Sequence, residues 1–101
     1  MWTNKNIIKI IINYHVESFE GLFKNCFSIK SINFKKFYRK NINNIHYMFY
    51  GCSSLIELNL NNFNTNNVIN MSGMFFLCSN ELIMKIKMKY NNIRKEAFYL
   101  L

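Results

Sequence analysis

The stretch from Ile42 to Leu60, INNIHYMFYGCSSLIELNL, decides how this chain folds. Its first half, INNIHYMFYGC, spaces apolar residues by three, three, one and three, which predicts one buried face of a helix. Gly51 near the end of that half allows a left-handed exit from the helix. The second half has the pattern L-x-x-L-x-L, and its alternation predicts a short strand at Leu58-Asn59-Leu60. The unit predicted is therefore a helix, a turn, a strand and an asparagine-rich loop.

The same pattern recurs at intervals of 26 residues along the chain, including its rarest positions. Two columns of identical residues carry the repeat: Cys26, Cys52 and Cys78, and Phe23, Phe49 and Phe75. Two further columns are apolar throughout: Leu22, Met48 and Met74, and Ile32, Leu58 and Met84. A fixed period of this length is typical of stacked units that bury their apolar faces on one another. The predicted fold class is an α/β repeat, a short solenoid of helix–strand coils with a 26-residue period and a C-terminal helical cap.

The chain has 101 residues, which allows one domain, 1–101. Residues 1–15 are expected to be a degenerate N-terminal part, because Asn6 falls where the repeat calls for a core strand residue. The repeat units are predicted at 16–41, 42–67 and 68–79, and the cap at 80–101.

Two patterns compete over residues 83–90 of the cap. Apolar residues alternate with Lys85, Lys87 and Lys89, which favours a strand. The apolar residues Leu82, Ile86, Tyr90, Ile93 and Ala97 are also spaced by four, four, three and four. That second spacing favours an amphipathic helix begun by Ser79 or Asn80. We favour the helix, because a terminal unit needs a polar outer face.

The segment from Met48 to Phe75, MFYGCSSLIELNLNNFNTNNVINMSGMF, resembles the repeat of BspA-like leucine-rich-repeat surface proteins. The likeness is specific across Ile42 to Cys78 and looser over Val16 to Asn41, and the ending from Cys78 to Phe98 resembles the segment that closes some of those arrays. The resemblance implies a leucine-rich-repeat solenoid without enzymatic activity, used as a surface or adhesion module. A cell-surface location is suggested by the resemblance alone, because the chain shows no signal peptide.

The net charge of +8 is concentrated at the two ends of the chain, with no Lys or Arg from Asn41 to Met84. Nucleic acid is disfavoured as a partner, because a nucleic-acid groove needs cations along a continuous path. A polyanion or membrane-surface binder acting through the basic ends is an alternative function. No apolar run is long enough for a transmembrane segment. The chain is expected to be a monomer or part of a longer array, and an inert fragment of such an array is a further alternative.

No residues point to catalysis, to a metal or to a cofactor. The three cysteines are spaced by the repeat rather than by a metal-binding pattern, which favours buried packing positions. A disulfide between neighbouring units would fit stacked coils, but the odd number of cysteines argues against a disulfide framework. His15 and His46 have no carboxylate or nucleophile at a recognisable spacing. The methionines Met48, Met71, Met74 and Met84 are expected in the core.

The polar residues that alternate with the buried strand positions form the candidate binding face. They are Ser31, Asn33, Lys35, Glu57, Asn59 and Asn61. Lys35 and Glu57 are expected to set the charge preference of this face. We interpret the chain as a non-enzymatic module for protein–protein recognition, cell-surface adhesion included, whose partner the sequence does not name.

Overall fold

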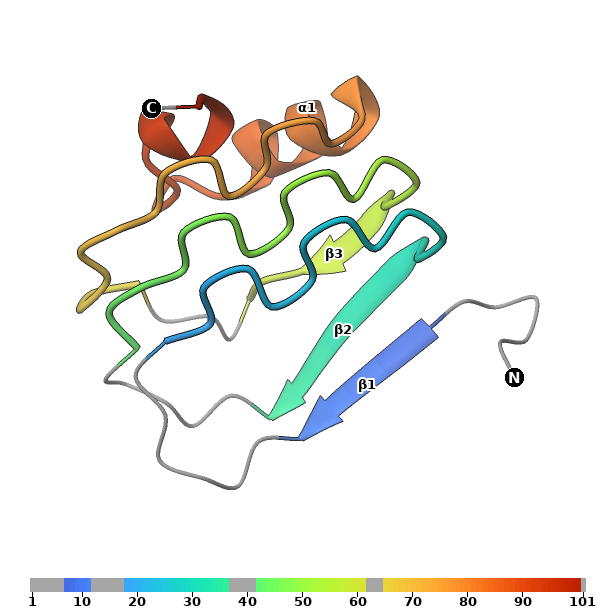
Figure 1. Cartoon of the computed structure of the whole chain (residues 1–101), viewed down its shortest axis with the longest axis horizontal. Coiled ribbons are helices and arrows are strands. Elements are labelled where there is room, and N and C mark those ends of the chain that lie inside the picture. Colours follow the sequence, from blue (N-terminus) through green and yellow to red (C-terminus); the bar gives the residue numbers. More distant parts are fainter. Residues whose placement is uncertain (1–6, 12–17, 37–41, 62–64, 101) are drawn as a thin grey trace.

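A computed structural model describes residues 7–11, 18–36, 42–61 and 65–100, with the backbone alone given for 7–11 and 35–36. Figure 1 shows its elements: strands β1 (Ile7–Ile11), β2 (Ser31–Lys36) and β3 (Glu57–Asn59), helix α1 (Asn80–Lys89) and the 3-10 helix η1 (Lys95–Phe98). The helix lies beyond β3, at the opposite side of the molecule from β1 (Figure 1).

The three strands form one parallel sheet in the order β1-β2-β3. Between β2 and β3 the register follows the 26-residue period, with Ile32 opposite Leu58. Between β1 and β2 it does not, because Ile8 rather than Asn6 lies opposite Ile32. The offset there is 24 residues (32 − 8). The prediction that Asn6 occupies the core strand position is therefore wrong, since the first connection is two residues shorter than the second.

Opposite the sheet lie three segments, 18–26, 44–52 and 70–78, which we call the turn wall. Their backbone hydrogen bonds alternate along the chain. Phe49 donates its N–H to Met74 of the next segment, whereas Tyr50 donates to Tyr47 of its own segment. The same alternation runs from Phe19 to Cys26. Some of these amides therefore close tight local turns and others join neighbouring segments.

The helices predicted within the repeat units, as at 42–52, are wrong. Backbone φ is positive at Gly21, Tyr47 and Gly73, and again four residues later at Asn25, Gly51 and Leu77. A left-handed residue at every fourth position interrupts an α-helix before it can propagate. The apolar spacing of three and four residues suits these successive turns as well as it suits a helix. Gly51 does take the predicted left-handed conformation, with φ +74°, but it ends a turn.

The predicted fold class, a leucine-rich-repeat solenoid of helix–strand coils, is corrected by these findings. The described residues form a small compact body, 35 × 30 × 22 Å, with a Cα radius of gyration of 12.7 Å. They contain parallel strands and a single α-helix, α1, and they show no solenoid. The physical reason is that the segments expected to be helices fold as turns joined edge to edge.

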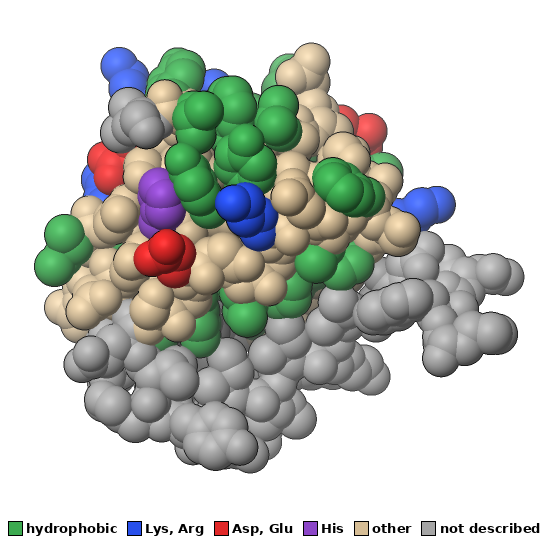
Figure 2. Space-filling model, in the orientation of Figure 1, with side chains coloured by type: hydrophobic (Ala, Val, Ile, Leu, Met, Phe, Trp, Pro, Cys, Tyr) green, Lys and Arg blue, Asp and Glu red, His purple; other side chains and the backbone are tan. Residues whose placement is uncertain are grey.

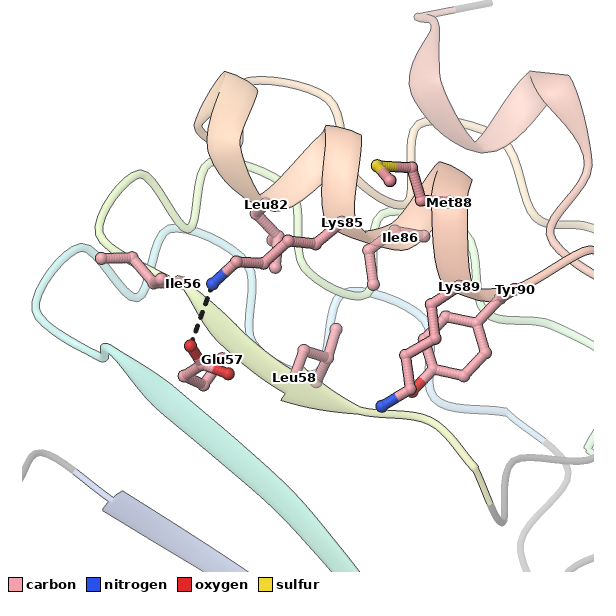
Figure 3. Close-up of a pocket in the computed structure, with 9 residues that line it drawn as sticks. All are labelled: Ile56, Glu57, Leu58, Leu82, Lys85, Ile86, Met88, Lys89 and Tyr90. Carbon is pink, nitrogen blue, oxygen red and sulfur yellow. Dashed lines mark hydrogen bonds and ion pairs between the residues drawn. The ribbon is translucent and has the colours of Figure 1, made fainter.

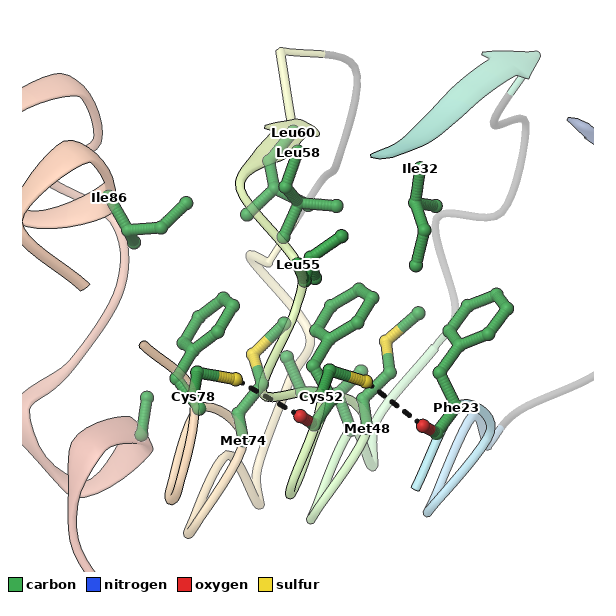
Figure 4. Close-up of a cluster of buried hydrophobic side chains, with 14 of the residues drawn as sticks. Phe23, Ile32, Met48, Cys52, Leu55, Leu58, Leu60, Met74, Cys78 and Ile86 are labelled. Carbon is green, nitrogen blue, oxygen red and sulfur yellow. Dashed lines mark hydrogen bonds between the residues drawn. The ribbon is translucent and has the colours of Figure 1, made fainter. Parts of the chain in front are cut away.

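The core lies between the sheet and the turn wall (Figure 4). Phe49 stacks between Phe23 and Phe75, with 5.5 Å between ring centroids on each side. Ile32 and Leu58 point inward from the strands, as the alternation predicts. Two expectations fail here. Leu22 is 44% exposed although Met48 and Met74 of its column are buried, because no described segment lies beyond the first one on the turn wall.

The second failure concerns Met84, which was expected in the core and is 63% exposed. The C-terminal segment is a helix, as favoured, and its period turns Leu82 and Ile86 inward and Met84 outward. Ser79 caps α1 by accepting the N–H of Leu82 at 3.1 Å.

The last segment of the turn wall is covered by the C-terminal residues. Gly73 donates its N–H to the carbonyl oxygen of Glu96 at 2.9 Å, and Phe75 donates to Ala97 at 2.7 Å. The ring of Phe98 stacks on Phe75, with centroids 5.7 Å apart. The amides that would otherwise be orphaned at this end are therefore satisfied by η1 and its flank.

Candidate functional site: the outward face of the sheet

The candidate binding face lies on the outward side of β2 and β3. Asn33, Glu57, Asn59 and Asn61 are exposed and Ser31 is half-buried. The sheet register sets Ser31 beside Glu57 and Asn33 beside Asn59, so the structure brings these predicted residues together in two adjacent pairs. Lys35 belongs to β2, but its side chain lies outside the described residues.

A shallow depression of about 230 Å³ runs across this face. Its polar lining comes from Ser31, Asn33, Glu57, Asn59 and Lys89 of α1. Part of the hydrogen-bonding capacity of the Asn59 side chain is used within the protein, because its Oδ1 accepts the N–H of Asn61 at 2.9 Å. The amide groups of this row offer both donors and acceptors to a partner backbone.

Beside the depression, a groove of about 290 Å³ separates β3 from α1 (Figure 3). Leu58, Leu82 and Ile86 give it a buried apolar lining. The hydroxyl of Tyr90 closes one end by accepting the N–H of Leu60 at 2.8 Å. Because Glu57, Leu58 and Lys89 line both hollows, the polar depression and the apolar groove are continuous.

Of the two residues expected to set the charge of this face, the side chain of Glu57 is described and that of Lys35 is not. The Glu57 carboxylate accepts from Lys85 Nζ at 2.9 Å, so its charge is matched within the protein (Figure 3). The hydrogen bond to Glu57 raises the pKa of Lys85. Lys89, at the rim of both hollows, makes no ion pair with any described residue, so its positive charge is unmatched there. The sequence did not indicate the pairing of Glu57 with Lys85, because that contact depends on where α1 lies in the fold.

The cysteines lie inside the core rather than at this site. Cys52 and Cys78 are buried, which confirms them as packing residues, and Cys26 is half-buried against the core. The Cys52 thiol donates to the carbonyl oxygen of Phe23 at 3.0 Å (Figure 4). Burial raises the pKa of Cys52 to about 12 and that of Cys78 to about 11. All three thiols are free, and the described residues hold no group of three His, Cys, Asp or Glu side chains placed to bind a metal.

The turn wall brings His46 to a serine that the sequence did not single out. His46 Nδ1 lies 2.6 Å from Ser72 Oγ, whose hydroxyl donates to Asn70 Oδ1 at 2.8 Å. With its hydrogen directed at Asn70, Ser72 accepts from His46, which is the reverse of the polarity that activates a nucleophile. The shared column of His46 and Ser72 was the signal for this contact. His15 lies outside the described residues.

Aromatic side chains cover the middle of the turn wall. Hydrophobic side chains gather there beside histidine, lysine and acidic side chains (Figure 2). The rings of Tyr47 and Tyr50 lie 4.9 Å apart, and Lys24 Nζ is 5.4 Å from each ring centroid. The Tyr47 ring is further held against His46, so its faces are largely used by its neighbours.

The comparisons with known proteins define the family. Residues 16–94 match the family model described as "Mycoplasma protein of unknown function, DUF285", and the chain belongs to that family. No curated protein and no solved structure gives a significant match. None of the helices in the described part of the chain is long and apolar enough to cross a membrane.

Proposed function

We propose that the chain is a non-enzymatic module that recognises a protein partner through the outward face of its sheet. The observation that carries this proposal is that β2 and β3 bury the side chains of one face in the core and expose those of the other. Ile32, Phe34 and Leu58 are buried in the core, whereas Asn33 and Asn59 are exposed in register on the other side. A partner can therefore be bound without disturbing the side chains that hold the fold.

The chemistry of this face suits an extended polypeptide. The amides of Asn33, Asn59 and Asn61 can donate to carbonyl oxygens and accept from N–H groups of a partner backbone. The adjoining groove offers apolar surface for a partner side chain, and Lys89 favours an acidic neighbour. The resemblance to BspA-like surface proteins supports adhesion as the setting of this recognition.

Site-specific photo-crosslinking tests the proposal. A benzophenone amino acid at Asn59 reports on the sheet face, and one at Ile69, which is 80% exposed before the third segment of the turn wall, serves as the control. We expect protein adducts in a native extract from position 59 that are absent from position 69 and lost on adding Asn33→Lys. Identical adducts from both positions would show non-specific contact and refute the sheet face as the recognition surface.

A further inference from the structure

The outer face of α1 carries two methionines that the fold does not use. Met84 is 63% exposed and Met88 is 85% exposed. They are four residues apart and so lie one turn above each other, opposite the buried Leu82 and Ile86. The core of this protein is rich in methionine, yet these two point away from it.

Lysines border this methionine face on both sides. At about 100° per residue, Lys87 falls on one side of the two methionines and Lys85 on the other, while Lys89 falls close to the buried Leu82. Lys85 is paired with Glu57 and Glu81, whereas Lys87 and Lys89 make no ion pair with described residues. Lys87 Nζ lies 4.8 Å from the centroid of Phe98. That contact leaves its charge uncompensated.

The border continues onto η1. Lys87 and Lys95 line a hollow of about 270 Å³ together with Phe98 and Tyr99. Tyr99 and Leu100 are each at least half exposed. Residues 80–100 carry five cations against two acids, Glu81 and Glu96, and Glu96 is paired with Arg94. This end of the molecule therefore combines positive charge with protruding apolar side chains.

We propose that the methionine face of α1, with Lys87 and Lys95 beside it, docks onto an anionic lipid surface. A helix that lies in a membrane interface buries an apolar face between the lipid headgroups. Lysines on either side of that face keep their ammonium groups at the level of the headgroups. Met88 protrudes in this way and the lysines match anionic headgroups in charge. An acidic polymer would use the lysines but has no need of the methionines. This surface shares Met88 with the groove beside the sheet face, whereas Met84, Lys87 and Lys95 line neither the groove nor the depression.

Sedimentation of the full chain with lipid vesicles tests the proposal. We expect binding to phosphatidylcholine vesicles that contain phosphatidylserine, with little binding to phosphatidylcholine alone. Because one lysine near an anionic surface strengthens attraction roughly fivefold, K87Q with K95Q should weaken binding about 30-fold. K24Q with K30Q removes the same charge from exposed positions elsewhere and should weaken it far less. M84Q with M88Q should also weaken binding, and thermal melts of all variants should match the parent chain.

Three results would overturn the proposal. The first is an absence of binding by the parent chain to phosphatidylserine vesicles. The second is equal weakening by the two lysine pairs, which would reduce the effect to net charge. The third is unchanged binding of M84Q with M88Q alongside tight binding to heparin, which would assign the surface to acidic polymers.

Discussion

The thiol of Cys78 donates a hydrogen bond to the backbone carbonyl oxygen of Phe49, 3.1 Å away. Cys52 makes the same bond to Phe23 at 3.0 Å, one 26-residue period earlier. Each buried thiol thus ties the segment that carries it to the segment before it. A small side chain with a weak donor satisfies both the packing and the hydrogen bond at this position.

These thiols give the first prediction, which concerns alkaline pH. The pKa of Cys52 is raised to about 12 in the folded chain from an ordinary value of 9.0, and that of Cys78 to about 11. The unfolded chain therefore loses these protons first, so the stability they contribute is complete below pH 9 and declines as pH rises towards 11–12.

Urea unfolding at a series of pH values checks this expectation. The decline in unfolding free energy above pH 9 should be shallower in Cys52→Ala than in the parent chain. If both chains declined with the same slope, the loss of stability would come from titrating groups other than Cys52. Iodoacetamide at neutral pH should also modify Cys26 before Cys52, because only the former is partly accessible.

A second prediction uses two glycines with the same backbone conformation. Gly21 and Gly73 have φ of +62° and +65°. A Cβ at Gly21 would have its nearest neighbour at 3.9 Å, whereas a Cβ at Gly73 would collide with the ring of Tyr47. We expect Gly21→Ala to cost about 1 kcal/mol of unfolding free energy and Gly73→Ala clearly more.

A double mutant separates the clash from the backbone cost. In a Tyr47→Ala background, Gly73→Ala should cost no more than Gly21→Ala does, since the ring is gone. If the extra cost of Gly73→Ala persisted without the ring, the close approach of Tyr47 would not be its cause.

A third prediction compares the two sides of α1. Leu82→Ala should cost about 2–5 kcal/mol as a buried truncation, and Met84→Ala should change stability by less than about 0.5 kcal/mol. Chemical denaturation of both variants decides between the helix and the strand that the sequence left open. A strand would place Leu82, Met84 and Ile86 on the same face, so Met84→Ala would then cost about as much as Leu82→Ala.

A fourth prediction compares a core residue of the turn wall with an outward residue of the sheet. Phe49→Ala should cost about 3–5 kcal/mol, because Phe49 lies between two stacked rings. Asn59→Lys should change stability by less than about 0.5 kcal/mol. Thermal melts that ranked these two variants the other way would contradict the placement of Phe49 in the core and of Asn59 on the outward face.

The sequence predicts the alternation of the strands better than it predicts the turn wall. Period-two alternation at Leu58 and Asn59 has one structural interpretation, and the structure buries the first and exposes the second. A spacing of three and four residues has two interpretations, since helices and successive turns both satisfy it. The sequence does not distinguish the two at Tyr47 and Leu77. Both residues have a positive φ, but neither is a residue type, such as glycine, that predicts one.

The candidate site shows the same limit. Alternation alone places Asn33 and Asn59 on the outward face. The pairing of Glu57 with Lys85, and the groove beside it, depend on where α1 lies, and no local pattern specifies that position. Met84 occupies the same repeat position as the buried Leu58, which predicts burial. Its exposure follows instead from the helical period of α1.

The most direct test of the proposed function measures stability and crosslinking on one variant. The Asn33 side chain makes no hydrogen bond to any described residue. Asn33→Ala should therefore leave the unfolding free energy within about 0.5 kcal/mol of the parent while it abolishes the protein adducts formed from a benzophenone at position 59. Full retention of those adducts in a chain of unchanged stability would contradict recognition through the sheet face.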